Sequence, residues 1–310
     1  MTAAPLEVRG LVKRYGDLTA VDGVDLTVNS GDVFGYLGPN GAGKTTSLRM
    51  MLGLIRPTAG EVRLFGRDPQ LGAAALEGVA GFVEAPRFYP YLTGRKNLEL
   101  LAALDGDGAA GRIDEVLDVV ELRDRAGDRV GGYSHGMGQR LGIAAALLRR
   151  PRLLLLDEPA TGLDPAGMRD MRLLIRRLAE QGMTVLLSSH LLAEVEEVCN
   201  RVAIIRRGRV VYEGSLADLR RAAGVAYRLR TTDDERAARV CAVQPGIDEV
   251  GRGDDGTLSF RAETERAVGE LSLALSEAGA LVLELVPRMA TLEDLFFELT
   301  EDHAATAVPA

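Results

Sequence analysis

The chain has 310 residues, of which 46% are hydrophobic, and a formal net charge of −8 at pH 7. This size allows a full hydrophobic core and more than one domain, whereas the acidic balance argues against a protein that holds nucleic acid by its overall charge. Because the apolar runs are far too short to cross a bilayer and the start MTAAPLEVRG lacks the pattern of a signal peptide, we expect a soluble cytoplasmic protein.

The first predicted strand ends at Tyr15, within VKRYGDLTAVDGV. A tyrosine at such a position can stack on a flat ring such as adenine. A half-buried tyrosine on an edge strand explains the residue about equally well. From the strand alone, both interpretations stay open.

A strand, a glycine-rich loop and a helix are predicted next, because VFGYLG leads into GPNGAGKTT and then KTTSLRMMLGLI. The loop (residues 38–46, the phosphate loop below) fits G-x-x-x-x-G-K-[S/T] in the structural context that this motif requires. Its backbone N–H groups and the helix N-terminus would surround the phosphates of a nucleoside triphosphate. Lys44 would reach the β- and γ-phosphates, and the Thr45 hydroxyl would bind Mg²⁺. The predicted nucleotide-binding residues here are Asn40, Gly41, Ala42, Gly43, Lys44, Thr45 and Thr46.

The segment YSHGMGQR (residues 133–140) precedes a run of alanines and leucines that predicts a helix. It holds a serine beside a histidine, but no acid is placed to orient the histidine for nucleophilic catalysis. Its glycines, Gly136 among them, indicate instead a backbone that another group approaches closely. Ser134 is also suited to cap the helix. We interpret His135 and His303 as surface residues.

Two later apolar runs, PRLLLLDEP and MTVLLSSH, end in polar residues, as expected of parallel strands buried on both faces. Asp157 and Glu158 follow the first run, at the sheet edge where α/β proteins bind ligands. Asp157 would hold Mg²⁺, as in other P-loop NTPases, and Glu158 would orient or deprotonate the attacking water. His190 ends the second run and could contact the γ-phosphate; a lone histidine there is more often structural, but the Asp–Glu pair on the neighbouring strand favours the functional interpretation.

The stretch between these two runs predicts an amphipathic helix, with Asp164 as N-cap, Pro165 at its first position and Gly182 past its end. Strand, helix and strand together form a βαβ unit. RVAIIRRGRVVYEGS then predicts two strands joined at Gly208. The two cysteines, Cys199 and Cys241, lie far apart without metal-site spacing, so we expect reduced, buried thiols.

The pattern changes at about residue 226, where strand- and helix-like segments follow in the order β-α-β-β-α-β. This order is that of a split βαβ, ferredoxin-like layout. We place the boundary near Gly224, and expect a short helix in TLEDLFFELTE and a disordered tail. The predicted organisation is α/β, with a nucleotide-binding domain over 1–224, a small α+β domain over 225–302 and the tail over 303–310.

Together, the phosphate loop, YSHGMGQR, LLLLDEPATGLDP and SSH resemble, in order and spacing, the ATP-binding subunits of ABC transporters. The resemblance covers about residues 6–219, and the C-terminal region is similar to that of bacterial drug- and antibiotic-export ATPases of the daunorubicin and bacitracin resistance types. It implies an ABC-type P-loop NTPase with a mixed sheet core and a helical subdomain at about residues 85–150. It also implies Mg²⁺-dependent ATP hydrolysis that drives a separate membrane permease, and it favours Tyr15 as the residue that stacks on adenine.

The resemblance places YSHGMGQR, the signature segment below, where the family usually has L-S-G-G-Q. In that family, ATP lies between the phosphate loop of one subunit and the signature of its partner. Ser134, the Gly136 N–H and the following helix start would then donate to the γ-phosphate. The implied partner is a second copy of the chain. His135 departs from the family pattern, because it replaces the first glycine of the signature.

A second departure lies in GFVEAPRFYPYLTGRKN, where the family generally has a glutamine that senses Mg²⁺ and the membrane partner. Glu84 takes that place here, as in the bacitracin and lantibiotic self-protection group, and a carboxylate can also ligate Mg²⁺. The aromatic residues Phe88, Tyr89 and Tyr91 follow. They could form the cleft that receives a cytoplasmic helix of the permease, or pack within the helical subdomain.

Three other functions compete with an export ATPase. A soluble ABC-type ATPase acting on ribosomes or DNA usually has two nucleotide domains or a coiled-coil insert, and this chain has one such domain and no heptad run. A regulatory module without turnover is disfavoured by the complete set of Lys44, Asp157, Glu158 and His190. A GTPase would need an N-K-x-D motif. The C-terminal domain could sense a ligand or stabilise the dimer.

Overall fold

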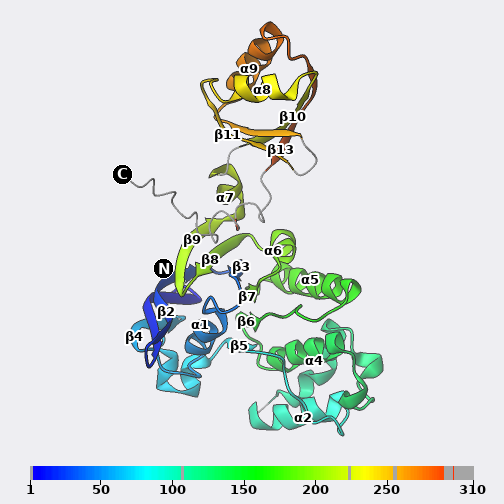
Figure 1. Ribbon diagram of the computed structural model, residues 1–310. Helices are drawn as coiled ribbons and strands as arrows, with labels where there is room; N and C mark the ends of the chain where they lie inside the picture. Colours follow the sequence, from blue (N-terminus) through cyan, green and yellow to red (C-terminus); the bar gives the residue numbers. More distant parts are fainter. Residues whose placement is uncertain (1–2, 106–107, 223–224, 254–256, 290–295, 297–310) are drawn as a thin grey trace. The chain divides into compact units, whose positions relative to one another are not determined.

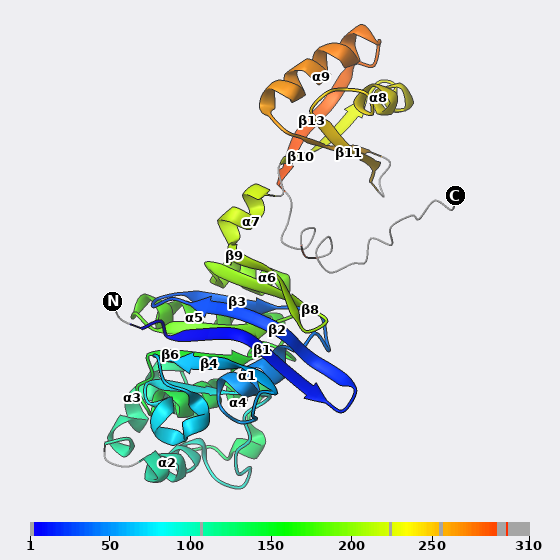
Figure 2. The same ribbon diagram turned by 90° about the vertical axis from the view of Figure 1, so that its left-hand side faces the viewer.

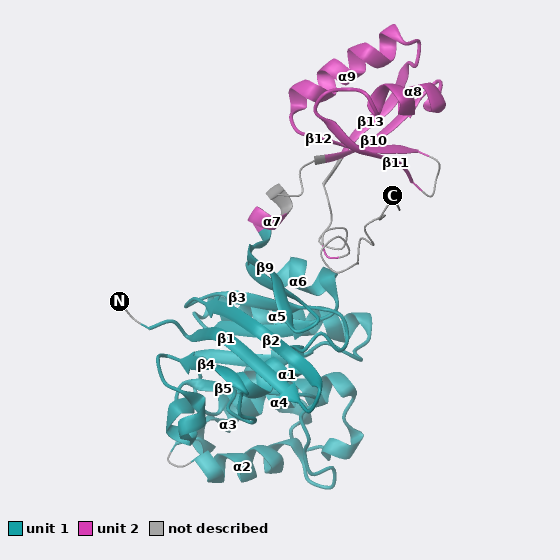
Figure 3. Cartoon of the chain, turned by 60° about the vertical axis from the view of Figure 1, so that its left-hand side comes forward, with its two compact units in different colours: residues 1–216 teal, residues 217–310 magenta. Residues whose placement is uncertain are grey.

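The computed structural model describes residues 3–105, 108–222, 225–253, 257–289 and 296. They divide into two compact units, residues 1–216 (unit 1) and 217–310 (unit 2) (Figure 3). The predicted boundary at Gly224 lies outside the described residues, as do the predicted tail and nearly all of the predicted helix before it. Among the described residues, no helix is both long enough and apolar enough to span a bilayer.

The centre of unit 1 is a six-stranded sheet in the order β5-β6-β7-β3-β8-β9. Neighbouring strands run parallel except β8 and β9, which form the predicted hairpin around Gly208. β3, β6 and β7 are buried along their whole length, which explains their uninterrupted apolar sequences. The strands are β3 (Val33–Leu37), β5 (Val79–Phe82), β6 (Leu153–Asp157), β7 (Thr184–Ser189), β8 (Arg201–Arg206) and β9 (Arg209–Ser215).

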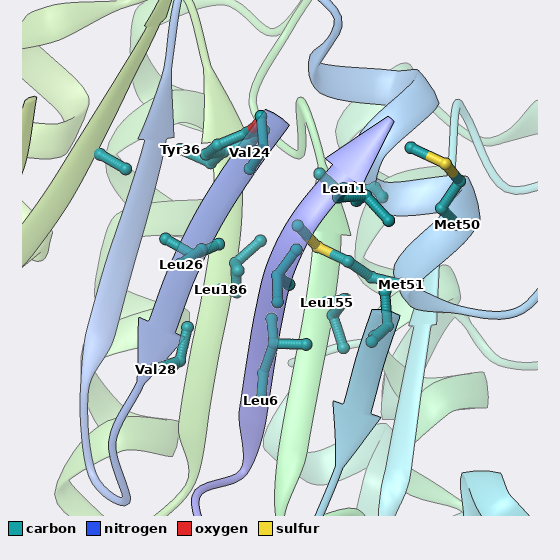
Figure 4. Packing of buried hydrophobic residues seen from close by; sticks show 14 of the residues in the cluster. Leu6, Leu11, Val24, Leu26, Val28, Tyr36, Met50, Met51, Leu155 and Leu186 are labelled. Atoms are coloured by element: carbon teal, nitrogen blue, oxygen red, sulfur yellow. The ribbon is translucent and has the colours of Figure 1, made fainter. Parts of the chain in front are cut away.

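A second, antiparallel sheet in the order β2-β1-β4 completes the sheet core of unit 1. Its strands are β1 (Leu6–Tyr15), β2 (Leu18–Val28) and β4 (Ala59–Leu64). Apolar side chains from both sheets and from helix α1 (Lys44–Met51) form one buried cluster. Figure 4 shows Leu6, Met51 and Leu155 within it. This core holds both ends of the phosphate loop, because the loop joins β3 to α1.

Helices α2, α3 and α4 lie together at one end of unit 1 (Figures 1 and 2), as expected of a helical subdomain. The other helices of unit 1 contact its strands. Helix α5 begins after Asp164, whose side chain accepts a hydrogen bond from the Gly167 N–H, as predicted. The helices are α2 (Gly94–Asp105), α3 (Ile113–Val119), α4 (His135–Leu147), α5 (Pro165–Glu180) and α6 (Leu192–Val198), and α7 (Leu216–Ala222) begins at the last residue of unit 1 and otherwise belongs to unit 2. Short 3₁₀ turns are Pro69–Leu71, Ala73–Leu76, Ala110–Arg112, Arg123–Arg125 and Val130–Gly132.

Unit 2 contains an antiparallel sheet in the order β11-β12-β10-β13, with α8 and α9 packed on it over a core of its own. Its connections follow the predicted β-α-β-β-α-β order. The elements are β10 (Val225–Thr231), α8 (Asp234–Cys241), β11 (Ile247–Arg252), β12 (Leu258–Ala262), α9 (Glu265–Glu277) and β13 (Val282–Met289). Cys241 lies in this core and Cys199 follows α6; both thiols are free and buried, and burial raises the pKa of Cys241 to about 11.

Candidate nucleotide-binding site

The phosphate loop owes its path to glycines that no other residue could replace without strain. Gly41 and Gly43 have φ of +80° and +107°, in the left-handed region that favours glycine. A Cβ on Gly43 would lie 2.4 Å from the Ala20 carbonyl oxygen, and one on Gly38 would lie 2.5 Å from that of Ile205. The loop therefore lies closely against neighbouring backbone, and the first N–H groups of α1 remain available to a ligand.

Lys44 is 6% exposed, and its charge is held within the phosphate loop. Its Nζ donates to the Gly38 carbonyl oxygen over 2.7 Å and lies 3.1 Å from Oε1 of Glu158. A buried ammonium group requires an anionic partner. In this structure that partner is Glu158, and the phosphates of a nucleotide can provide the same charge.

Asp157 ends β6 and is 3% exposed. Its Oδ1 accepts a hydrogen bond of 2.6 Å from the Ser188 hydroxyl, and Oδ2 accepts one of 3.4 Å from the Glu84 N–H. The Ser188 oxygen in turn accepts the Glu158 N–H at 3.0 Å. Ser188, which sequence reasoning missed, thus joins the two acids through β7. The sequence signal that could have identified Ser188 is its position in SSH, two residues before His190.

Glu158 lies at the meeting point of three segments that are distant in sequence. Its Oε1 faces Lys44, whereas Oε2 lies 2.6 Å from His190 Nδ1 and accepts a 2.7 Å hydrogen bond from the Thr161 hydroxyl. Burial raises its pKa, but the Thr161 hydroxyl, the Lys44 charge and His190 together hold the pKa below its ordinary value. The group is therefore a carboxylate at neutral pH, as a proton acceptor must be. Thr161 was also missed from the sequence.

The backbone of Glu84 reaches the acidic pair, while its side chain points elsewhere. The residue has φ +66°, and its N–H contacts Asp157. Its carboxylate is 61% exposed and pairs with Arg49 of α1 at 2.5 Å. Metal binding by Glu84 stays a prediction, and it requires this ion pair to open.

Ser134 and Gly136 lie at the start of α4. The Ser134 oxygen caps α4 by accepting the Met137 N–H at 3.2 Å, as predicted. Both residues line a cavity of about 380 Å³ between the starts of α4 and α5. In the described part of the chain, neither bonds to a phosphate-loop residue. His135 is exposed as predicted, but its Nε2 lies 3.1 Å from the Thr161 carbonyl oxygen; His303 lies outside the described residues.

Tyr15 ends β1 with its side chain 47% exposed, and the Lys13 ammonium group lies 5.0 Å from the ring centre. β1 is the middle strand of its sheet. The pairing of β1 with β4 ends at Val12, however, and Tyr15 itself pairs only with Leu18 of β2, so the interpretation of Tyr15 as a half-buried residue at a sheet edge also stays open. An exposed ring leaves room for stacking on a base, which stays a prediction.

The residues present fit a triphosphate with its magnesium ion. The loop N–H groups, the α1 N-terminus and Lys44 form a concentrated positive region. Within the described ranges, no cluster of three or more His, Cys, Asp or Glu could hold a metal by itself. Magnesium is commonly bound by one or two carboxylates together with substrate phosphates, so Asp157 and Thr45 suit it when nucleotide is bound.

A phosphate loop at the carboxyl edge of parallel strands, with a carboxylate pair at the end of β6, which is separated from β3 by β7 alone, defines a P-loop NTPase. Residues 21–161 match the family described as ABC transporter. The bacitracin transport ATP-binding protein BcrA of Bacillus licheniformis is 38% identical over 296 residues, covering 95% of this chain and 96% of that protein. The daunorubicin resistance ATP-binding protein DrrA3 of Streptomyces coeruleorubidus is 37% identical over 311 residues, covering 97% and 98%.

Among solved structures, the dimeric post-hydrolysis state of the ATP-binding cassette MJ0796 bound to ADP and Pi matches with a TM-score of 0.61 and 27% identity, over 68% of this chain and 98% of that one. The chain belongs to the ABC transporter ATP-binding proteins, in the group of the bacitracin and daunorubicin resistance proteins. It is an ATP-binding ATPase. The predicted fold class and family are thereby confirmed.

Proposed function

We propose that the chain is the ATP-hydrolysing subunit of an exporter, which dimerises around Mg-ATP and drives a separate membrane permease. The observation that carries this proposal is the position of Glu158, whose carboxylate lies between Lys44 and His190 beside Asp157. Relatives named for bacitracin transport and daunorubicin resistance support a drug, peptide or other small molecule as the exported compound.

In the proposed reaction, Glu158 accepts a proton from the attacking water, and His190 holds the carboxylate and the γ-phosphate in register. Lys44 exchanges its contact with Glu158 for the β- and γ-phosphates, which frees the carboxylate for the water. Thr45, Asp157 and Glu84 would hold Mg²⁺, which would supply charge stabilisation to the phosphates when bound. Tyr15 stacks on the adenine. Each residue thus has one of the roles expected from its position in the sequence.

The composite dimer is supported by the signature segment, whose Ser134 and Gly136 have no bond to the phosphate loop in the part of the chain that the structure describes. Ser134 caps α4 and has its oxygen at an exposed helix start, which suits donation to a phosphate on another chain. MJ0796 is dimeric in its solved structure. One chain then contributes two half-sites, and a second copy completes both.

A groove of about 410 Å³ between β5 and helices α2 and α4 suits a helix of the permease. Its lining is mainly apolar, and Leu54 and Leu104 are 63% and 83% exposed. Apolar grooves of this kind receive amphipathic helices. Of the predicted aromatic residues, Phe88 lines the groove, whereas Tyr89 and Tyr91 are exposed beside each other with ring centres 5.8 Å apart. Docking there would hold the subunit at the inner face of the cell membrane.

Mixed dimers test the composite site. Lys44→Ala disables the phosphate loop and Ser134→Arg disables the signature, so each homodimer has two damaged sites. In a heterodimer of the two variants, purified through two different tags, one site joins both lesions and the other is intact. We expect this heterodimer to retain labelled ATP at about one site per dimer.

The matched control places both lesions in one chain, paired with the unaltered chain. That heterodimer has the same two substitutions but no intact composite site, so it should retain no ATP. If both arrangements trap ATP equally, or if neither does although the variants fold and associate, the composite site is wrong.

A further inference from the structure

A hydrogen-bonded path leads from the signature segment to the acid proposed as the base, within a single chain. His135 is the first residue of α4, and its Nε2 lies 3.1 Å from the Thr161 carbonyl oxygen. Since a carbonyl oxygen only accepts, this nitrogen carries the hydrogen and donates it. The hydroxyl of the same Thr161 donates to Oε2 of Glu158 at 2.7 Å. Two hydrogen bonds, both made by Thr161, therefore connect His135 to Glu158, the proposed proton acceptor.

The His135 ring and Glu158 both lie beside the turn that contains Thr161. Gly162 has φ +78°, and a Cβ built on it would lie 3.4 Å from the His135 ring, so the ring rests against this turn. The Thr161 N–H also donates to the Glu158 carbonyl oxygen at 3.1 Å. Backbone and side chain of Thr161 are thus both tied to Glu158. A shift of the imidazole would move the Thr161 peptide and, with it, a hydrogen bond on Oε2.

We propose that His135 is a positioning residue, which acts through Thr161 to hold Glu158 of its own chain in place for hydrolysis. The inference rests on the proposed function, because in the composite dimer His135 and Glu158 of one chain belong to different ATP sites. A nucleotide against one signature segment is then linked to the proton acceptor of the other site. A glycine at this position would have no side chain and could not make the bond, so the link depends on His135.

A merely local role for His135, such as shaping the start of α4, makes a different prediction. It would affect only the ATP site that its own signature segment completes. The positioning role instead affects the site that contains Glu158 of the same chain. A dimer with a single working site separates the two possibilities.

The parent heterodimer for this test combines an unaltered first chain with a second chain carrying Lys44→Ala. Its working site uses the phosphate loop and Glu158 of the first chain and the signature segment of the second. His135→Ala is then introduced into the first chain only, whose signature segment belongs to the disabled site. We expect ATP to be retained as in the parent, and its single-turnover hydrolysis to slow roughly tenfold, within the ~100-fold cost of misplacing a catalytic group.

Variants of Thr161 in the first chain test the second hydrogen bond of the path, from the Thr161 hydroxyl to Glu158. Thr161→Val removes the hydroxyl and should slow hydrolysis by a similar factor, whereas Thr161→Ser keeps it and should stay near the parent rate. His135→Gln keeps an N–H donor and should recover part of the loss. Because both residues act in one path, the double variant His135→Ala/Thr161→Val should be no slower than Thr161→Val alone.

The outcomes are distinct. If the parent heterodimer fails to trap ATP, the composite site itself is wrong and the inference falls with it. If the parent traps and hydrolyses ATP but His135→Ala in the first chain leaves the rate unchanged, the proposed function stands and the positioning role is overturned. A slower rate only when His135→Ala is placed in the second chain overturns it as well.

Discussion

Glu158 follows β6 with φ +48°, a backbone conformation that is uncommon for residues other than glycine. The turn directs the carboxylate toward Lys44 and His190 instead of back into the sheet. The Ser188 hydroxyl, which accepts the Glu158 N–H, helps to hold the turn. Glu84, whose N–H contacts Asp157, also has a positive φ, and backbone strain of this kind is common at functional sites.

Glu158→Gln tests this role directly. The amide keeps the size of the side chain and can still accept the Thr161 hydrogen bond, but it cannot take a proton from water. We expect ATP binding to persist and hydrolysis to slow by a factor of roughly 10²–10⁴. An ATPase assay paired with nucleotide-binding measurements checks the prediction, and near-normal turnover would exclude Glu158 as the base.

Glu194 is a second acid near this site, and its environment has the opposite effect on its pKa. It is 7% exposed; its Oε2 accepts a 3.2 Å hydrogen bond from Ser189, while its buried Oε1 has no hydrogen-bond partner among the described residues. Burial raises the pKa of Glu194 above its ordinary value, despite the Ser189 hydroxyl. This position in the folded state therefore favours the neutral acid over the carboxylate.

Glu194→Gln should therefore raise the free energy of unfolding at pH 7–8. Because the folded pKa lies above the unfolded value of about 4.3, the original chain loses stability as pH rises through the folded pKa. The glutamine variant does not titrate, so its advantage should shrink toward zero below about pH 4. Urea unfolding at both pH values measures this, and an original chain that is the more stable at pH 8 would contradict it.

At the scale of elements, helix α4 determines how the helical subdomain approaches the site. Its residue Gly142 packs against the segment that follows Glu84, since a Cβ there would lie 2.5 Å from Pro86 Cγ and 3.4 Å from the Phe82 ring. The pyrrolidine ring of Pro86 is rigid, and the residue is half-buried, so the ring has little room to move. The glycine thus allows α4 and this segment to lie in contact beside the proposed permease groove.

Gly142→Ala should overpack this contact. We expect a loss of about 1–3 kcal/mol of stability, or a lower melting temperature by about 2–4 °C for each kcal/mol. Gly138→Ala, in the same helix, is the matched control, because its Cβ would meet nothing within 4 Å. That variant should be neutral or up to about 1 kcal/mol more stable. Equal melting temperatures for the two variants would contradict the prediction, because they would show that Pro86 moves aside without a cost in stability.

At the scale of the whole molecule, the two compact units each have a separate hydrophobic core. The phosphate loop, both acids and His190 all lie in unit 1. A ligand stabilises the folded unit that it binds. Nucleotide should therefore act on unit 1, whatever the role of unit 2 in sensing a ligand or stabilising the dimer.

Calorimetry of the full chain should accordingly show two unfolding transitions, of which Mg-ATP raises one. At a nucleotide concentration of about 100 times Kd, the stabilisation of roughly 2.7 kcal/mol corresponds to a shift of about 5–10 °C. The Glu158→Gln variant prevents turnover during the scan. The Lys44→Ala variant, which should not bind the nucleotide, is the control and should show no shift. A shift of both transitions by equal amounts would show that the units unfold together.

Features that depend on residues close together in the chain could be predicted from the amino-acid sequence. The phosphate loop, the acids after an apolar run and the caps at Ser134 and Asp164 were all predicted, because each is a local pattern with a local physical cause. The alternation of strand- and helix-like segments also sufficed for the α/β class and for the order of elements in unit 2.

Only the tertiary structure decided which of these local features meet. The sheet order places β6 beside β7 and β7 beside β3, and this order brings Lys44, Glu158 and His190 together from segments more than a hundred residues apart at their extremes. The same packing revealed the Thr161 and Ser188 hydroxyls and turned the exposed His135 toward Thr161. Such contacts arise from the burial of distant strands against one another, and no short sequence pattern records that packing.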